Sequence, residues 1–101
     1  MSNASIFLGS VWEIDQMHPV TGRRVFRVRF YKNGVLQNFH PNDTTPSDDR
    51  WSADDKSLNI YFNSSYSVYR GTIESSGFVT GTATNRGGDL WSWKAERLHN
   101  E

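Results

Sequence analysis

The chain has 101 residues, of which 14% are aromatic, and 11 Lys and Arg balance 11 Asp and Glu, so the formal net charge is zero. This length fits one domain, residues 1–101, and the balanced charge excludes a whole-molecule attraction to nucleic acid, membranes or acidic partners. The absence of cysteine excludes disulfides, thiolate metal sites and a cysteine nucleophile, and it is typical of a reducing compartment such as the cytoplasm.

Apolar and polar residues alternate in short runs along most of the chain, which is the period of a strand rather than of a helix. Asn, Gly, Ser and Asp separate these runs and indicate turns. In chain order the pattern predicts eight strands, at residues 6–15, 24–32, 35–40, 51–53, 57–62, 67–74, 78–84 and 90–98.

The strongest turn signal is Asn33-Gly34, which lies between two apolar-patterned runs. Both residue types tolerate a positive φ, so the pair predicts a two-residue type I′ hairpin. In that register Gln37 lies opposite Phe30 and Phe39 lies opposite Val28, and all four side chains point inward. The first strand should place Leu8, Ser10, Trp12 and Ile14 on the same inner face.

The last four predicted strands form a meander whose short loops set the register. Leu58 then lies opposite Gly71, and a slip of one residue would turn the apolar side chains of that strand to the polar face. Gly81 falls between Gly71 and Trp93, so small residues lie beside the largest. An indole over a strand glycine covers the exposed backbone, which explains glycines in the middle of strands.

Every long strand thus has one apolar face, and no helix is predicted to cover it. The economical solution is a sheet that closes on itself, because closure buries that face and removes both edges. The sequence therefore predicts an all-β fold, an eight-stranded antiparallel up-and-down barrel. A two-sheet β-sandwich remains as an alternative, because short turns and alternation look the same in both.

The segment Gly9-Ser10-Val11-Trp12, together with Arg97 near the end of the last strand, resembles the calycin barrels: lipocalins, fatty-acid-binding proteins and avidin. In that superfamily a Trp in the first strand follows closely on a Gly and packs against an Arg of the last strand. Here one more residue separates Gly from Trp than is usual. The resemblance implies that Trp12 and Arg97 close one barrel end and that the mouth binds a small apolar or amphipathic molecule.

No catalytic or metal-binding constellation is apparent in the sequence. His18, His40 and His99 lie far apart without metal-ligand spacing, and surface positions are the interpretation for all three. Glu13 and Asp15 share an outward parity and are expected to face water. We therefore expect no enzyme activity, no metal and no cofactor. Residues 1–9 have no basic region and no long apolar run, so we expect no secretory signal, and because no apolar run reaches about 20 residues we expect no membrane span.

Two sets of residues are candidate binding sites. Arg27, Arg29 and Tyr31 share the outer face of the second strand, with His40 across the hairpin, and form the one local basic cluster. Such a cluster suits an acidic partner, although the neutral chain argues against nucleic acid. The interior set holds large rings that either fill the barrel or line a site for one small ligand. Its members are Phe30, Phe39, Phe62 and Tyr69.

Two functional interpretations follow, and both are non-catalytic. The first is a barrel that binds a small molecule in its interior. The second is a solid-cored module that binds or inhibits another protein through its surface, which the outward parity of Tyr61, Tyr66, Val68 and Phe78 favours. The identity of the ligand or partner does not follow from the sequence.

Overall fold

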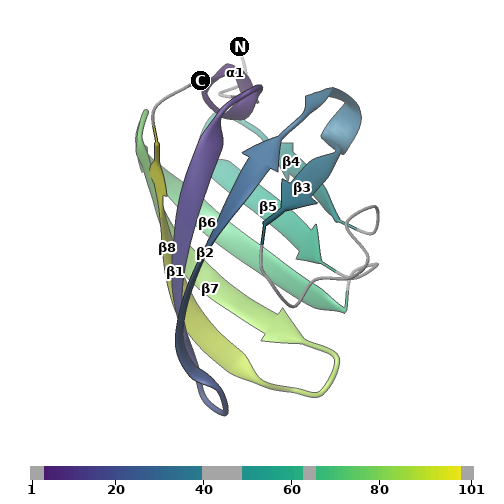
Figure 1. Cartoon of the computed structure of the whole chain (residues 1–101), viewed down its shortest axis with the longest axis vertical. Helices are drawn as coiled ribbons and strands as arrows, with labels where there is room; N and C mark the ends of the chain where they lie inside the picture. Colours follow the sequence, from purple (N-terminus) through teal and green to yellow (C-terminus); the bar gives the residue numbers. More distant parts are fainter. Residues whose placement is uncertain (1–3, 40–48, 63–65, 99–101) are drawn as a thin grey trace.

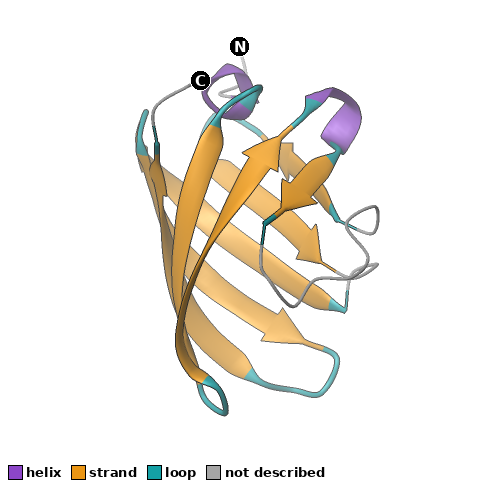
Figure 2. Cartoon of the chain, viewed as in Figure 1, coloured by secondary structure: helices purple, strands orange, loops and turns teal. Residues whose placement is uncertain are grey.

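The computed structural model describes residues 4–39, 49–62 and 66–98. Figure 2 shows that strands dominate this part of the chain, with two very short helical turns, α1 (Ala4–Phe7) and η1 (Lys32–Gly34). The eight strands are β1 (Val11–His18), β2 (Gly22–Phe30), β3 (Leu36–Asn38), β4 (Arg50–Ala53), β5 (Ser57–Phe62), β6 (Ser67–Ser75), β7 (Phe78–Asn85) and β8 (Leu90–Arg97). Within the described ranges, no helix has the length and apolar character needed to cross a membrane.

The strands form one antiparallel sheet in the order β3-β2-β1-β8-β7-β6-β5-β4, which curls into a nearly closed barrel (Figure 1). An antiparallel bridge between Val35 and Arg50 joins the two ends of this sheet. The Trp51 indole N–H adds to the closure, because it donates to the backbone oxygens of Tyr31 and Val35 at 2.8 and 3.0 Å. The predicted all-β barrel is confirmed, and the sandwich alternative is wrong because the sheet is continuous.

The predicted register of β5 to β8 is also confirmed. Leu58 pairs with Gly71, and Gly81 pairs with both Gly71 and Trp93. A Cβ built on Gly71 would lie 2.8 Å from Cζ2 of Trp93, so the indole occupies the space above this glycine. The Trp93 indole N–H also donates to the Thr82 carbonyl oxygen at 3.0 Å. The two glycines therefore allow β6, β7 and a large ring to approach closely.

The predicted register of the β2–β3 hairpin is wrong by one residue. Asn33 and Gly34 do have positive φ values of 63° and 74°, but the Tyr31 N–H donates to the Val35 oxygen, so the loop has three residues. Phe30 therefore pairs with Leu36, which is fully buried. A slip of one residue exchanges the two faces of a strand. Phe39 consequently points outward and is 46% exposed, which contradicts its predicted interior position.

The N-terminal segment is a helical turn followed by a bend, and the prediction of a strand from residue 6 is wrong. Leu8 is largely exposed, whereas Phe7 is fully buried at the end of the barrel. The Phe7 ring lies 4.8 Å from the Trp12 ring, 5.1 Å from Phe30 and 6.0 Å from Trp51. This end of the barrel is therefore sealed by α1, as Figure 1 shows at the top of the molecule.

The buried hydroxyl of Ser10 fixes the bend between α1 and β1. It donates toward the Phe7 and Ile6 oxygens at 2.5 and 3.0 Å, and it accepts the Trp12 indole N–H at 2.9 Å. Arg97 is the register partner of Trp12, as expected for the closing pair, but its side chain is exposed. The polar partner of the Trp12 indole is thus the serine rather than the expected arginine.

Candidate functional site: the barrel mouth

The end of the barrel opposite α1 is formed by the β1–β2 turn and the β7–β8 loop, at the bottom of Figure 1. We call this end the mouth and define it by the polar side chains Gln16, His18 and Asp89 and the rings of Tyr69 and Trp91. The inward parity of β1, which carries Trp12 and Ile14, continues through Gln16 to His18. The same strand thus contributes apolar side chains to the sealed end and polar side chains to the mouth.

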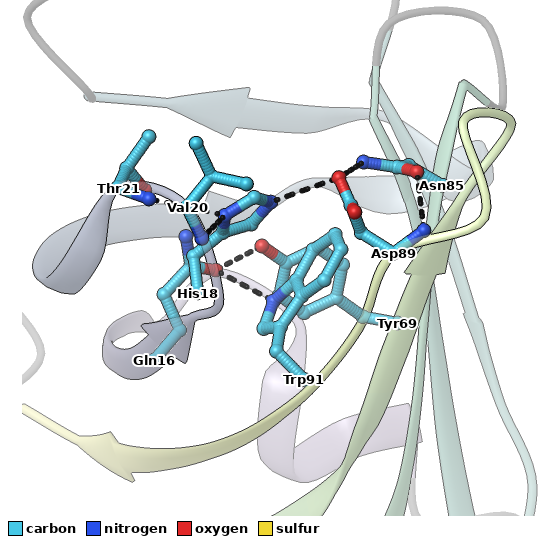
Figure 3. A network of polar contacts seen from close by, with 8 residues as sticks. All are labelled: Gln16, His18, Val20, Thr21, Tyr69, Asn85, Asp89 and Trp91. Carbon is cyan, nitrogen blue, oxygen red and sulfur yellow. Dashed lines mark hydrogen bonds and ion pairs between the residues drawn. The ribbon is translucent and has the colours of Figure 1, made fainter.

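Gln16 is the centre of the polar contacts at the mouth (Figure 3). Its side-chain oxygen accepts a hydrogen bond from the Tyr69 hydroxyl and another from the Trp91 indole N–H at 3.3 Å. These partners come from β6 and β8, so one amide connects three strands. Burial raises the pKa of the Tyr69 hydroxyl to about 12, which keeps this group neutral at physiological pH.

His18 and Asp89 lie at the rim of the mouth. The His18 Nδ1 accepts the backbone N–H groups of Val20 and Thr21 at 3.0 and 3.3 Å, which fixes the β1–β2 turn. Its Nε2 lies 3.8 Å from Oδ2 of Asp89, and the imidazole centre lies 4.5 Å from the Trp91 ring. Because Nδ1 is an acceptor here, the proton of the neutral imidazole is on Nε2, facing Asp89.

Asp89 is itself held by the β7–β8 loop, as Figure 3 shows. The Asn85 side-chain nitrogen donates to Oδ2 of Asp89 at 3.1 Å, and the Asp89 backbone N–H donates to Oδ1 of Asn85 at 3.1 Å. The rim therefore joins the β1–β2 turn to the β7–β8 loop through one histidine and one carboxylate.

The aromatic rings are buried at both ends of the barrel. At the sealed end Phe7, Trp12, Phe30 and Trp51 have exposed fractions of 0%, 0%, 1% and 7%. The rings toward the mouth have similar values: Phe26 7%, Phe62 5%, Tyr69 3%, Trp91 6% and Trp93 4%. They also contact one another, since Tyr69 lies 5.0 Å from Phe62 and 5.7 Å from Trp91 between ring centres. The mouth thus carries a packed aromatic cluster, and the difference between the two ends lies in the polar side chains beside this cluster.

The predicted interior set is only partly brought together. Phe62 and Tyr69 are in contact near the mouth, whereas Phe30 belongs to the sealed end with Phe7 and Trp51. Phe39 lies outside the barrel because of the hairpin register. Of the four residues, only Phe62 and Tyr69 therefore remain near the candidate site.

The predicted surface patch is on the outer face of β2, and one of its two arginines is paired with a carboxylate, as is the neighbouring Arg23. Arg27 lies 3.6 Å from the Glu13 carboxylate, and Arg23 makes a bidentate pair with Asp15 at 2.8 and 3.1 Å. This pairing lowers the pKa of Asp15, chiefly through the Arg23 hydrogen bond. Both carboxylates are supplied by the outward parity of β1.

Arg29 is the arginine of the predicted patch that keeps an unpaired group, because its buried Nε has no hydrogen-bond partner in the described chain. The Tyr31 hydroxyl beside it donates to the Gln37 side-chain oxygen at 2.8 Å. His40, the fourth member of the predicted patch, lies outside the described residues.

The sequence interpretation missed Gln16, His18 and Asp89. A first strand that ends at residue 15 leaves out Gln16 and His18, which continue the inward parity of β1 to its end, and the sequence prediction for His18 is a surface position. It is mostly buried, with a side-chain exposure of 14%. The available signal was the continued alternation through Trp12, Ile14, Gln16 and His18. Within the described ranges, no group of three or more His, Cys, Asp or Glu residues is placed to hold a metal ion.

Comparisons with known proteins inform the fold. Neither a protein-family model nor a curated protein matches the chain. Among solved structures the chain is similar to a redesigned beta barrel, with a TM-score of 0.63 and 12% sequence identity over 97% of this chain and 96% of that one. At this identity the similarity concerns the fold alone, which is a small antiparallel barrel.

Proposed function

We propose that the chain is a non-catalytic binding protein whose barrel mouth takes a small apolar or amphipathic molecule. The observation that carries this proposal is the contrast between the side chains that close the two ends. One end is closed by α1 and the buried ring of Phe7, whereas the other places the side chains of Gln16 and His18 beside the rings of Tyr69 and Trp91. Binding sites for small molecules combine mostly apolar walls with a few polar groups in fixed positions.

The buried Tyr69 hydroxyl and Trp91 indole N–H both need an acceptor, and the Gln16 oxygen supplies it. A polar group among rings costs stability unless it is hydrogen-bonded, and the mouth uses contacts from three strands to hold one amide. Holding a polar side chain rigidly among rings is what a ligand site requires, because an ordered site loses little entropy on binding.

The experiment is a titration of the protein labelled with nitrogen-15 with 6-propionyl-2-(dimethylamino)naphthalene, a neutral fluorescent probe. The four indole N–H signals supply matched controls, because Trp91 and Trp93 lie toward the mouth and Trp12 and Trp51 contact Phe7. We expect saturable shifts of the Trp91 signal and nearly unchanged Trp12 and Trp51 signals. Shifts at Trp12 alone, or no saturable shift at any indole, would contradict the proposal.

The calycin relationship is part of this proposal. Gly9 precedes β1, Trp12 is in the first strand, and Arg97 in the last strand is the register partner of Trp12. The exposure of Arg97 departs from the packing that the superfamily pattern implies. The order of the strands and the positions of these three residues support the relationship.

A second candidate function is a protein-interaction module that uses the outer face of β2 and β3. Phe39, Tyr31 and Val35 are all exposed there, beside Arg29. The test is a comparison of Arg29→Glu with Arg23→Glu as a matched control, because Arg23 is already paired with Asp15. A partner that uses this face should lose affinity with Arg29→Glu and keep it with Arg23→Glu.

A further inference from the structure

The orientation of the Gln16 amide follows from its partners. An indole N–H is a donor only, so the atom of Gln16 that faces Trp91 must be the oxygen. The Tyr69 hydroxyl donates to the same oxygen. An amide oxygen has two lone pairs, and both are therefore used within the protein.

The amide nitrogen of Gln16 is left with its two N–H groups. None of the hydrogen bonds in the described chain uses this nitrogen, although the oxygen of the same amide is held by two strands. The site thus offers fixed donors and no spare acceptor at this point. A bound molecule can satisfy these donors only with an acceptor atom.

The surroundings of Gln16 favour an uncharged acceptor. Its nearest side chains, Tyr69 and Trp91, are neutral and more than nine-tenths buried, and the burial that raises the pKa of Tyr69 also disfavours an anion. The charged side chains of this end lie at its rim: Asp89 faces His18, and Arg24, the register partner of Gln16, is exposed. Gln16 itself is half-buried, so a carboxylate bound there would lose part of its hydration without gaining a buried cation from the described residues.

We propose that the mouth binds a compact apolar molecule carrying an uncharged carbonyl group, whose oxygen accepts hydrogen bonds from the Gln16 amide. This inference rests on the proposed function and adds the class of ligand. The rings of Phe62, Tyr69 and Trp91 contact the apolar body, and Gln16 selects the polar group.

The experiment compares three probes of similar size: 2-acetylnaphthalene, 2-ethylnaphthalene and 2-naphthoate. A neutral hydrogen bond contributes enough to predict about three- to tenfold tighter binding of the ketone than of the hydrocarbon. Gln16→Glu keeps an acceptor for Tyr69 and Trp91 and, in its ionised form, has no donor, so at a pH where this carboxylate is ionised it should abolish the preference for the ketone over the hydrocarbon. Gln37→Glu is the matched control, because Gln37 lies on the outer face of β3.

The side-chain NH₂ signals of the two glutamines give a second readout in the unmodified protein. The ketone should shift the Gln16 pair and not the Gln37 pair, and the hydrocarbon should shift neither strongly. This measurement holds even if Gln16→Glu fails to fold.

The possible failures are distinct. If the ketone and the hydrocarbon bind with equal affinity and the ketone does not shift the side-chain NH₂ signals of Gln16, the inference is overturned and the proposed function stands. Tightest binding by 2-naphthoate overturns the uncharged class. If none of the three probes binds, the proposed function itself fails.

Discussion

Replacing Gly81 with alanine is the sharpest test of the packing between β6 and β7. A Cβ at this position would lie 2.0 Å from the Arg70 carbonyl oxygen and 2.6 Å from the Gly71 Cα. Ordinary carbon–oxygen contacts are about 3.3 Å or longer. Both obstructing atoms belong to the backbone and cannot rotate away, so the two strands must separate.

The expected cost of Gly81→Ala follows from that separation. Overpacking costs about 1–3 kcal/mol, and the loss of one backbone hydrogen bond adds about 1 kcal/mol, so we expect the free energy of unfolding to fall by about 2–4 kcal/mol. For a domain of this size the melting temperature should fall by at least about 8 °C. A typical domain has about 5–15 kcal/mol of stability, so a loss of this size still permits a folded variant.

Two other glycines provide graded controls. At Gly71 the added Cβ would meet side-chain atoms, Val79 Cγ1 at 2.6 Å and Trp93 Cζ2 at 2.8 Å, which can move. We expect Gly71→Ala to cost about 1–3 kcal/mol. At Gly77 the nearest atom is 3.9 Å away, and the change should stay within about 0.5 kcal/mol. Urea denaturation and calorimetry measure all three. A Gly81→Ala variant as stable as Gly77→Ala would refute the close approach of the strands.

Three further predictions concern the barrel seam and two titrating groups. Trp51→Phe removes the indole hydrogen bonds to the backbone oxygens of Tyr31 and Val35, so the free energy of unfolding should fall by about 1–3 kcal/mol. The backbone N–H of Leu36, which donates to the Asp49 oxygen across the same seam, should then exchange its hydrogen with solvent faster. An unchanged exchange rate would show that the Trp51 hydrogen bonds do not hold the two sheet ends together. Because Arg23 lowers the pKa of Asp15, Asp15→Asn should be less stable than the wild type above about pH 4. The urea midpoints of the two proteins should converge as the pH falls through the lowered pKa that Asp15 has in the folded protein. Burial raises the pKa of Tyr69 to about 12, so this tyrosine ionises at a lower pH in the unfolded chain than in the folded protein. The wild type should therefore lose stability relative to Tyr69→Phe as the pH rises from about 10 toward 12. If the two proteins lose stability equally over this pH range, the Tyr69 hydroxyl is not buried.

The second half of the fold could be predicted because local and long-range signals agree there. The loops of β5 to β8 are short, and only one register keeps Leu58 and Ile60 on the apolar face opposite Gly71 and Tyr69. The alternation therefore determines which residues meet, without knowledge of the rest of the barrel.

The β2–β3 hairpin could not be predicted with the same success, because its two signals conflict. Asn33-Gly34 favours a two-residue loop, whereas burial of Leu36 requires three residues in the loop. The structure follows the burial, and the exposure of Phe39 is the result. The helical turn α1 was missed for a related reason, since Phe7 is buried by contacts with residues distant in sequence.

The candidate site depends on contacts that no local pattern reveals. Gln16 and Tyr69 are separated by 53 positions, and Gln16 and Trp91 by 75. The parity of β1 could have placed Gln16 and His18 inside, but the partners of each depend on how the sheet closes. The sequence therefore allowed prediction of the barrel and of Tyr69 as an interior residue, but not of the amide that Tyr69 contacts.

The burial of Phe7 also has a consequence for the order of folding. Its three ring partners are Trp12 of β1, Phe30 of β2 and Trp51 of β4. In the sheet β4 is at the end far from β1 and β2, so it comes close to these two strands only where the barrel closes. Contacts that require distant segments to be ordered first tend to form after the rate-limiting step. Docking of α1 should therefore occur late in folding, and it should slow unfolding much more than it speeds folding. The sealed end thus increases the kinetic stability of the completed barrel.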